Sequence, residues 1–269
     1  LSGFTELVFD PGTGDLLLSP SVESIKAIRQ ICLFAKKIQL PCTREREKKA
    51  IDGYLEVEQT FRDTTSFSLY YDVFVRVSEI LWPIVFHDFE EVLGELLPKH
   101  GPGATEEKLS GNRKYLSRRW HQRLDRIFPL DSYMFANAAC MVEEDDFVRT
   151  IELVQEESEQ PVRVTLVPKT LKAPRIIAIE PVCMQYTQQA LFSYLRERLE
   201  SSWLTRGHVN FTDQSVNRSL ALENSKTRQL ATLDMSAASD RVPLEHVKGM
   251  LRMCPTLLDA LLCSRSSKA

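Results

Sequence analysis

An aspartate near the C-terminal end of the chain could bind a hard metal ion, and a second aspartate would stand at the mouth of the same site. Asp234 directly follows residues 229–233 (QLATL), which are mostly apolar and predict a short buried strand, and Asp240 stands six positions later on the next turn. A carboxylate fixed at the end of a strand can serve as one of the few protein ligands of Mg²⁺, while phosphates and water supply the others. The small residues 236–239 would let a sugar approach closely. Alone, this pattern is more typical of a helix cap, so the metal-site interpretation depends on a second motif.

The second motif is a set of basic residues on two segments that are predicted to pair as strands. Residues 162–166 and 175–179 contain alternating or β-branched apolar residues, and a proline-marked loop joins them. Lys169, Lys172 and Arg175 lie on this loop or at its end. Basic groups held by strands could lie over a triphosphate and stabilise the charge on the leaving pyrophosphate. An exposed edge hairpin with protective lysines explains the same pattern and is the better interpretation of this hairpin taken alone.

Taken together and in this order, four segments resemble the replicase β subunit of the leviviruses, which are small positive-strand RNA bacteriophages. These segments are residues 100–103 (HGPG), 167–181, 213–217 (DQSVN) and 230–240 (LATLDMSAASD). The resemblance covers the chain from about residue 100 to about residue 266, whereas the residues before about 67 match only in character. The last two segments are long enough to be specific.

The resemblance implies an RNA-directed RNA polymerase that carries out nucleotidyl transfer with two Mg²⁺ ions. Asp234 would be the catalytic, metal-binding aspartate, and Asp240 would lie near the ribose of the nucleotide. Lys169, Lys172 and Arg175 would contact the incoming nucleotide or the template. No Gly-Asp-Asp turn follows Asp234 in this sequence, so we expect one anchor of a two-metal site, and no polymerase activity from the chain alone.

The same resemblance implies partners and a location. The partners would be an RNA template, nucleoside triphosphates, the host elongation factors Tu and Ts, and a ribosomal protein. The location would be the cytoplasm of the bacterial host.

Two alternative functions stay open: a different palm-type polymerase such as a reverse transcriptase, and a non-catalytic RNA-binding module. The small residues 236–239 argue against a reverse transcriptase, since a DNA-synthesising enzyme needs a bulky side chain that excludes the 2′-hydroxyl.

The formal net charge of −3 conceals charges that are separated into blocks. Residues 108–128 hold seven basic residues against one acid, and residues 143–159 hold eight acids against one arginine. Such blocks can present a cationic channel to a polyanion, although solvated faces explain either block equally well. We predict RNA contacts by four members of the basic block, Arg113, Lys114, Arg118 and Arg119.

The elements that must position these residues predict an α+β fold. The first expected helix starts at Ser21 and has a buried stripe through Phe34. Further helices are expected at 44–59, at 78–97 with a break at Pro83, at 184–202, and from Pro243 to 253. The basic block is also helix-prone. The resemblance adds a right-hand polymerase shape, with a helical N-terminal region at 1–99, fingers at 100–228 and the start of the palm at 229–269. The thumb and the rest of the palm would be missing.

Composition sets the outer limits of these predictions. With 43% apolar residues in 269, the chain can bury a sizeable core. It contains neither a run of about 18 apolar residues nor the layout of a signal peptide, so we expect a soluble protein. Six cysteines without a C-x-x-C pair predict reduced and mostly buried thiols.

Overall fold

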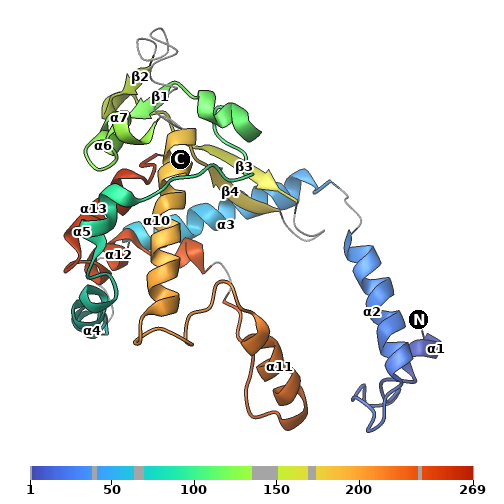
Figure 1. Ribbon diagram of the computed structural model, residues 1–269. Coiled ribbons are helices and arrows are strands. Elements are labelled where there is room, and N and C mark those ends of the chain that lie inside the picture. Colours follow the sequence, from blue (N-terminus) through green and yellow to red (C-terminus); the bar gives the residue numbers. More distant parts are fainter. Residues whose placement is uncertain are drawn as a thin grey trace. The chain divides into compact units, whose positions relative to one another are not determined.

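The computed structural model describes residues 2–37, 41–63, 70–134, 151–168, 174–235 and 238–268. Figure 1 labels the helices and strands of this part of the chain. The chain divides into two compact units, of which the first comprises 1–55 and 166–177 and the second comprises 56–165 and 178–269. Helices predominate and the sheets are small, which agrees with the α+β class expected from the sequence. No described helix is both long and apolar enough to cross a membrane.

The first unit contains α1 (Ser2–Thr5), α2 (Val22–Lys37) and the beginning of α3 (Arg44–Asp63). Ser21 caps α2 as predicted, because its Oγ accepts a hydrogen bond of 3.3 Å from the backbone N–H of Ser24. The predicted buried stripe is wrong in its second half, since Ile31 is 44% and Phe34 is 73% exposed. The neighbouring α1 has only four residues and is too short to cover a helix of 16 residues.

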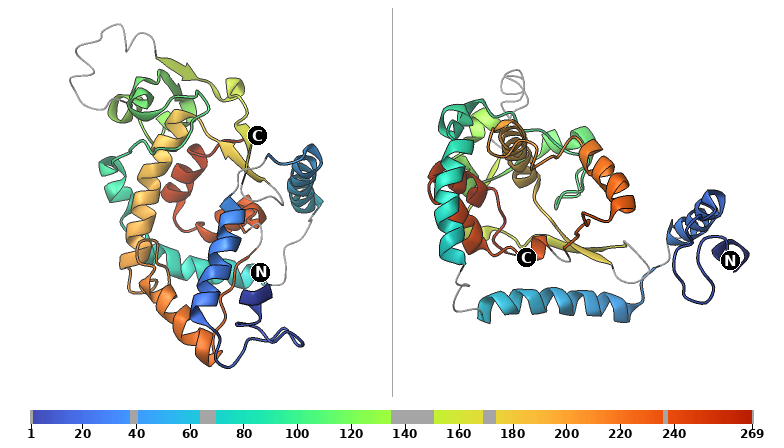
Figure 2. Two further views of the ribbon diagram at one scale, coloured as in Figure 1. Left: turned by 90° about the vertical axis from the view of Figure 1, so that its right-hand side faces the viewer. Right: turned by 90° about the horizontal axis from the view of Figure 1, so that it is seen from below.

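The core of the second unit is built mainly on α10 (Val182–Ser201), which confirms the helix expected at 184–202. Its buried side chains recur at three- and four-residue intervals and so share one face, as Met184, Thr187, Leu191 and Tyr194 show. This face packs beside α13 (Pro255–Cys263), and Figure 2 shows the two helices side by side in both views.

Three further helical segments complete this core, and one of them corrects a prediction. α4 (Tyr71–Val85) passes through Pro83, where a break was expected, and the chain turns only after Val85, before α5 (Phe89–Val92). Pro83 lies in the last turn of α4, so the missing N–H costs a single hydrogen bond, and the amide of Phe86 still bonds to the carbonyl of Trp82 at 2.8 Å. After Pro243, α12 (Leu244–Met250) forms as predicted, although it ends earlier than expected.

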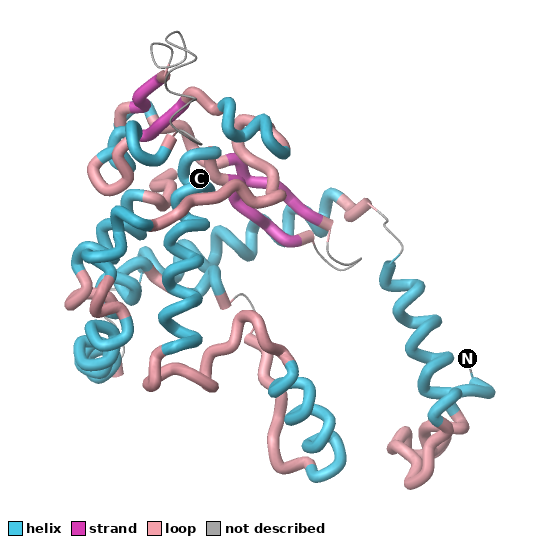
Figure 3. Tube along the Cα trace, in the orientation of Figure 1, coloured by secondary structure: helices cyan, strands magenta, loops and turns pink. Residues whose placement is uncertain are grey.

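Two separate pairs of short strands are present, as Figure 3 shows. β3 (Arg163–Val167) pairs with β4 (Arg175–Ile179), which confirms the predicted strand pair. Only seven residues separate these strands, too few for a parallel crossover, so the pair is antiparallel. β1 (Arg119–His121) pairs in parallel with β2 (Glu152–Val154), which the sequence did not predict because each strand has only three residues.

The basic block is not a continuous helix, contrary to expectation. It forms η2 (Gly111–Leu116), β1 and the single turn α6 (Gln122–Asp125). Lys108 and Gly111 have φ angles of +59° and +56°, a left-handed conformation that interrupts a helix. The remaining described elements are η1 (Leu93–Glu95), α7 (Leu130–Tyr133), η3 (Glu156–Ser158), α11 (Ser215–Thr227) and η4 (Ser239–Arg241).

The cysteines follow the prediction only in part. The five described cysteines are free, which agrees with reduced thiols, and Cys183 and Cys263 are buried. Burial raises the pKa of each of these two thiols to about 12. Cys32, however, is exposed, so it is not a core residue as expected.

Candidate functional site

Asp234 lies on an exposed loop between α11 and η4. The strand expected at 229–233 is not formed, and Leu233 and Met235 on either side of the aspartate are 88% and 77% exposed. A strand holds a carboxylate rigidly only when its own N–H and C=O groups are bonded to a neighbouring strand, and no described strand pairs with these residues. The rigid placement of Asp234 that the sequence suggested is therefore absent from this structure.

Asp240 sits on η4, where its carboxylate accepts a hydrogen bond of 3.2 Å from the hydroxyl of Ser239 and faces solvent. The following helix α12 is fixed against α4. The hydroxyl of Tyr71 donates to the carbonyl of Glu245 at 3.0 Å, and a Cβ atom added at Gly249 would lie 2.6 Å from that hydroxyl. The C-terminal side of the aspartate segment is therefore anchored by α4, and Gly249 makes this close contact possible.

The carboxylates present can supply part of a metal site. Mg²⁺ is commonly held by one or two carboxylates together with phosphates and water, so Asp234 fits the role of a single protein ligand. In the part of the chain that the structure describes, no three His, Cys, Asp or Glu side chains gather where they could hold a metal ion. A two-metal site would need further carboxylates beside Asp234.

Of the three basic residues predicted to contact the nucleotide or the template, only Arg175 can be placed. Arg175 is exposed at the start of β4, whereas Lys169 and Lys172 lie outside the described residues. Arg175 belongs to the first unit, and Asp234 belongs to the second. The approach of these basic groups to the aspartate therefore stays a prediction.

Three of the four predicted RNA-binding residues lie at the surface. Arg113 and Arg118 are exposed, on η2 and just before β1. Arg119 is partly exposed, and its guanidinium lies 3.2 Å from the carboxylate of Glu152 and 4.0 Å from that of Glu106. The two acids compete with any phosphate for Arg119, whose side chain is less exposed than those of Arg113 and Arg118.

Lys114 does not fit the predicted RNA contact. The residue is 2% exposed, and its ammonium donates hydrogen bonds to the carbonyls of Gly101 at 2.6 Å and Gly103 at 2.5 Å. These carbonyls compensate the burial of the charge, because a buried ammonium must be hydrogen-bonded. In this structure Lys114 fixes the turn at residues 101–103 and cannot reach a phosphate at the surface.

The segment of residues 100–107 is seated on the N-terminal turns of α10. The ring of His100 stacks on Tyr186 with a centroid distance of 4.4 Å, and the side-chain amide of Gln185 donates to the carbonyl of Ala104 at 2.7 Å. Glu107 accepts a hydrogen bond from the first amide of α10, Val182, at 3.0 Å. Burial, helped by the nearby charge of Lys114, lowers the pKa of His100 to about 4. These contacts give a structural role to a segment whose role the sequence did not reveal.

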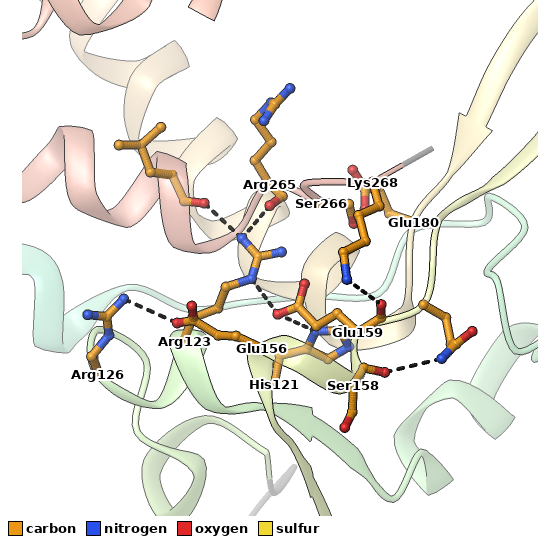
Figure 4. A network of polar contacts seen from close by, with 12 residues as sticks. His121, Arg123, Arg126, Glu156, Ser158, Glu159, Glu180, Arg265, Ser266 and Lys268 are labelled. Atoms are coloured by element: carbon orange, nitrogen blue, oxygen red, sulfur yellow. Dashed lines mark hydrogen bonds and ion pairs between the residues drawn. The ribbon is translucent and has the colours of Figure 1, made fainter.

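A buried ion pair between Arg123 and Glu159 fixes the residues that follow α13 (Figure 4). Nε of Arg123 lies 2.6 Å from Oε1 of Glu159, and both side chains are at most 10% exposed. The same guanidinium donates to the carbonyl of Leu262 at 3.0 Å and to that of Arg265. Nδ1 of His121 also lies 3.2 Å from Glu159, and burial lowers the pKa of this histidine despite the opposing effect of the carboxylate.

Sequence reasoning missed this network because Arg123 was assigned to the surface charge of the basic block. Arg126, three residues later, is a true surface residue with a side chain 73% exposed, and it lies beside a hollow of about 540 Å³. Nothing in the spacing of the two arginines separates the buried one from the exposed one. The apolar residues Trp120, Leu124 and Phe128, all of them buried, are the local signal that this part of the block belongs to the core.

Comparison with known proteins gives one family and several relatives. A family model described as "RNA replicase, beta-chain" matches residues 130–269, just over half of the chain. The chain is 39% identical over 106 residues to the "RNA-directed RNA polymerase subunit beta" of Enterobacteria phage SP, and 37% identical over 106 residues to that of Escherichia virus Qbeta. Each match covers 39% of this chain but only 17% of the relative. The "RNA-directed RNA polymerase beta chain" of Escherichia phage MS2 is 37% identical over 79 residues, which are 29% of this chain and 14% of that protein.

Proposed function

Because the chain belongs to the RNA replicase beta-chain family, we propose that it is part of a phage RNA-directed RNA polymerase that copies an RNA genome by metal-dependent nucleotidyl transfer. The observation that carries this proposal is the extent of the family match. Residues 130–269 include Asp234, Asp240 and the basic hairpin at 163–179. The matched segments span about a sixth of the relatives, so the complete activity belongs to a longer protein in this proposal.

In the proposed enzyme, Asp234 supplies a carboxylate ligand to Mg²⁺, and Asp240 contacts the ribose of the nucleotide. Lys169, Lys172 and Arg175 contact the triphosphate or the template. When bound, the metal ions supply neutralisation of the charge that develops on the reacting phosphate. The substrates are nucleoside triphosphates and an RNA template. The proposed location is the cytoplasm of the bacterial host, and the proposed partners there are the elongation factors Tu and Ts and a ribosomal protein.

The exposed residues around Asp234 support a place in a polymerase palm. Leu230, Leu233 and Met235 are each more than half exposed, which is costly for three large apolar side chains within six residues. Pairing with a neighbouring strand would bury them and would hold Asp234 at a sheet rim. We therefore propose that 229–233 becomes a strand of the palm when such a partner is supplied, with residues 100–228 as fingers.

Template-dependent incorporation of labelled nucleotides tests this function in the full-length protein. Asp234→Asn keeps the size of the side chain but removes the charge that Mg²⁺ requires, so incorporation should fall by roughly several orders of magnitude while RNA binding stays unchanged. Asp131→Asn, at another exposed aspartate, is the matched control and should keep the full rate. Equal rates for the two variants would remove Asp234 from the active site.

A further inference from the structure

The segment after α10 carries an exposed tryptophan. Trp203 is 73% exposed, whereas Trp120 is 2% exposed and Trp82 is packed against the core. A large aromatic surface in water is costly, and tryptophan at a protein surface is enriched where another molecule is contacted. Trp203 opens the loop of residues 203–211, which no role assigned above uses.

This loop is held in one conformation by the end of α10. The hydroxyl of Thr205 donates to the carbonyl of Leu199 at 2.7 Å, and the carboxylate of Glu200 accepts the amides of Phe211 at 2.6 Å and Thr212 at 2.9 Å. These amide donors hold the pKa of Glu200 below its usual range. Gly207 provides the left-handed turn with a φ angle of +83°. Trp203 is therefore presented on a preformed surface.

The loop also carries positive charge. Residues 201–212 contain no acid, while Arg206 and His208 are exposed. No carboxylate of the described residues lies within ion-pair distance of Arg206. The amide of Arg206 bonds to the carbonyl of Ser202 at 2.8 Å, as in a helical turn, and residues three apart on such a turn lie on the same side, so Arg206 neighbours Trp203.

A second aromatic group lies at the other end of the loop. Phe211 packs edge-on against Phe192 of α10, with ring centroids 6.0 Å apart, and the guanidinium of Arg196 lies 5.8 Å from the centre of the Phe192 ring. Phe192 and Phe211 are 44% and 47% exposed. Each end of the loop thus combines an exposed ring with an arginine.

We propose that the loop of residues 203–211 is a binding site for single-stranded RNA, in which a base stacks on the indole of Trp203 and Arg206 contacts a neighbouring phosphate. Exposed rings beside cations are the features that bind single strands without regard to sequence, because every base has a face that can stack. A protein partner could also use Trp203, but the unpaired charge of Arg206 favours an anion. The proposal rests on the proposed function, which makes RNA the substrate.

Fluorescence titration of the 269-residue chain tests this site, since Trp203 is its one strongly exposed tryptophan. A uridine oligomer of about 12 nucleotides should quench the fluorescence of Trp203. It should also bind more tightly than duplex RNA, whose bases are already stacked on one another. Trp203→Leu should weaken binding about fivefold or more, measured by anisotropy of a labelled oligomer, and Trp203→Tyr should restore most of the affinity. Arg206→Gln should make the negative slope of log K against log salt shallower by about 0.7, because one phosphate contact is lost.

The controls separate this proposal from its alternatives. Heparin, a polyanion without bases, should leave the emission of Trp203 unquenched. Equal quenching by heparin, or unchanged RNA affinity in Trp203→Leu with normal circular dichroism, would overturn base stacking. Concentration-dependent burial of Trp203 without RNA would identify a protein interface instead. Asp131→Asn, at an exposed aspartate outside this loop, should bind the oligomer normally. A failure of this site appears as unchanged RNA affinity in Trp203→Leu, whereas a failure of the catalytic assignment appears as unchanged incorporation by Asp234→Asn in the full-length protein, so the two failures give different results.

Discussion

Removing Arg123 should destabilise the second unit far more than the loss of a surface charge. Arg123→Ala leaves the carboxylate of Glu159, whose side chain is 5% exposed, buried with only His121 beside it, and burial lowers the pKa of that histidine and so disfavours its charged form. It also removes the donor to the carbonyls of Leu262 and Arg265. Breaking one side of a buried ion pair typically costs about 3–5 kcal/mol, a large fraction of the roughly 5–15 kcal/mol that stabilises a domain.

Urea unfolding followed by circular dichroism measures this loss. With a slope of about 2–3 kcal/mol per molar urea, the midpoint of Arg123→Ala should fall by about 1–2.5 M. Arg126→Ala is the matched control, since its partner Glu156 lies 3.8 Å away at the surface, and its cost should stay below about 1 kcal/mol. The double variant Arg123→Leu with Glu159→Leu should be more stable than Arg123→Ala, because no unpaired charge is left inside. Similar midpoints for Arg123→Ala and Arg126→Ala would refute the buried-pair reasoning.

Three further predictions concern the site and its surroundings. In the full-length protein, Asp240→Ala should leave metal-dependent incorporation measurable but reduce discrimination between ribo- and deoxyribonucleotides, and unchanged discrimination would place Asp240 away from the sugar. The pKa of His100 is lowered from 6.5 to about 4, so the folded chain loses stability as the pH falls from 6.5 to 4. His100→Phe keeps the ring stack and should make stability less dependent on pH in this range, which urea unfolding midpoints measured at several pH values would show. The chain alone should incorporate no nucleotide. It should bind RNA with a slope of about −2 in log K against log salt if Arg113, Arg118 and Arg119 contact phosphates, and binding that does not depend on salt would exclude these contacts.

The elements with long, regular patterns could be predicted from the sequence. The helix α10 has apolar residues at helical spacing over 20 positions, and the strand pair β3–β4 has β-branched residues around a proline-marked loop. In both, local preference and tertiary packing favour the same structure. The cap of α2 at Ser21 was predictable for the same reason, because it depends only on residues within one turn.

The strand expected at 229–233 shows where local preference is insufficient. Leu230, Ala231 and Leu233 suit a strand, but a strand exists only when another segment completes its hydrogen bonds. Burial within the basic block was also unpredictable. Lys114 and Arg123 share their residue types with exposed neighbours, and only the positions of the distant carbonyls and of Glu159 decide that they face inward.

In the proposed polymerase Asp234 is a metal ligand, and a change in the preferred metal ion tests this role. In the full-length protein, Asp234→Cys replaces a hard carboxylate by a soft thiolate, which binds Mg²⁺ poorly and softer ions better. Template-dependent incorporation should be nearly abolished with Mg²⁺ and partly restored with Mn²⁺ or Cd²⁺, while Asp234→Asn should show no restoration with the same ions. Full activity of Asp234→Cys with Mg²⁺, or equal loss with every ion in both variants and in Asp131→Cys, would contradict the assignment.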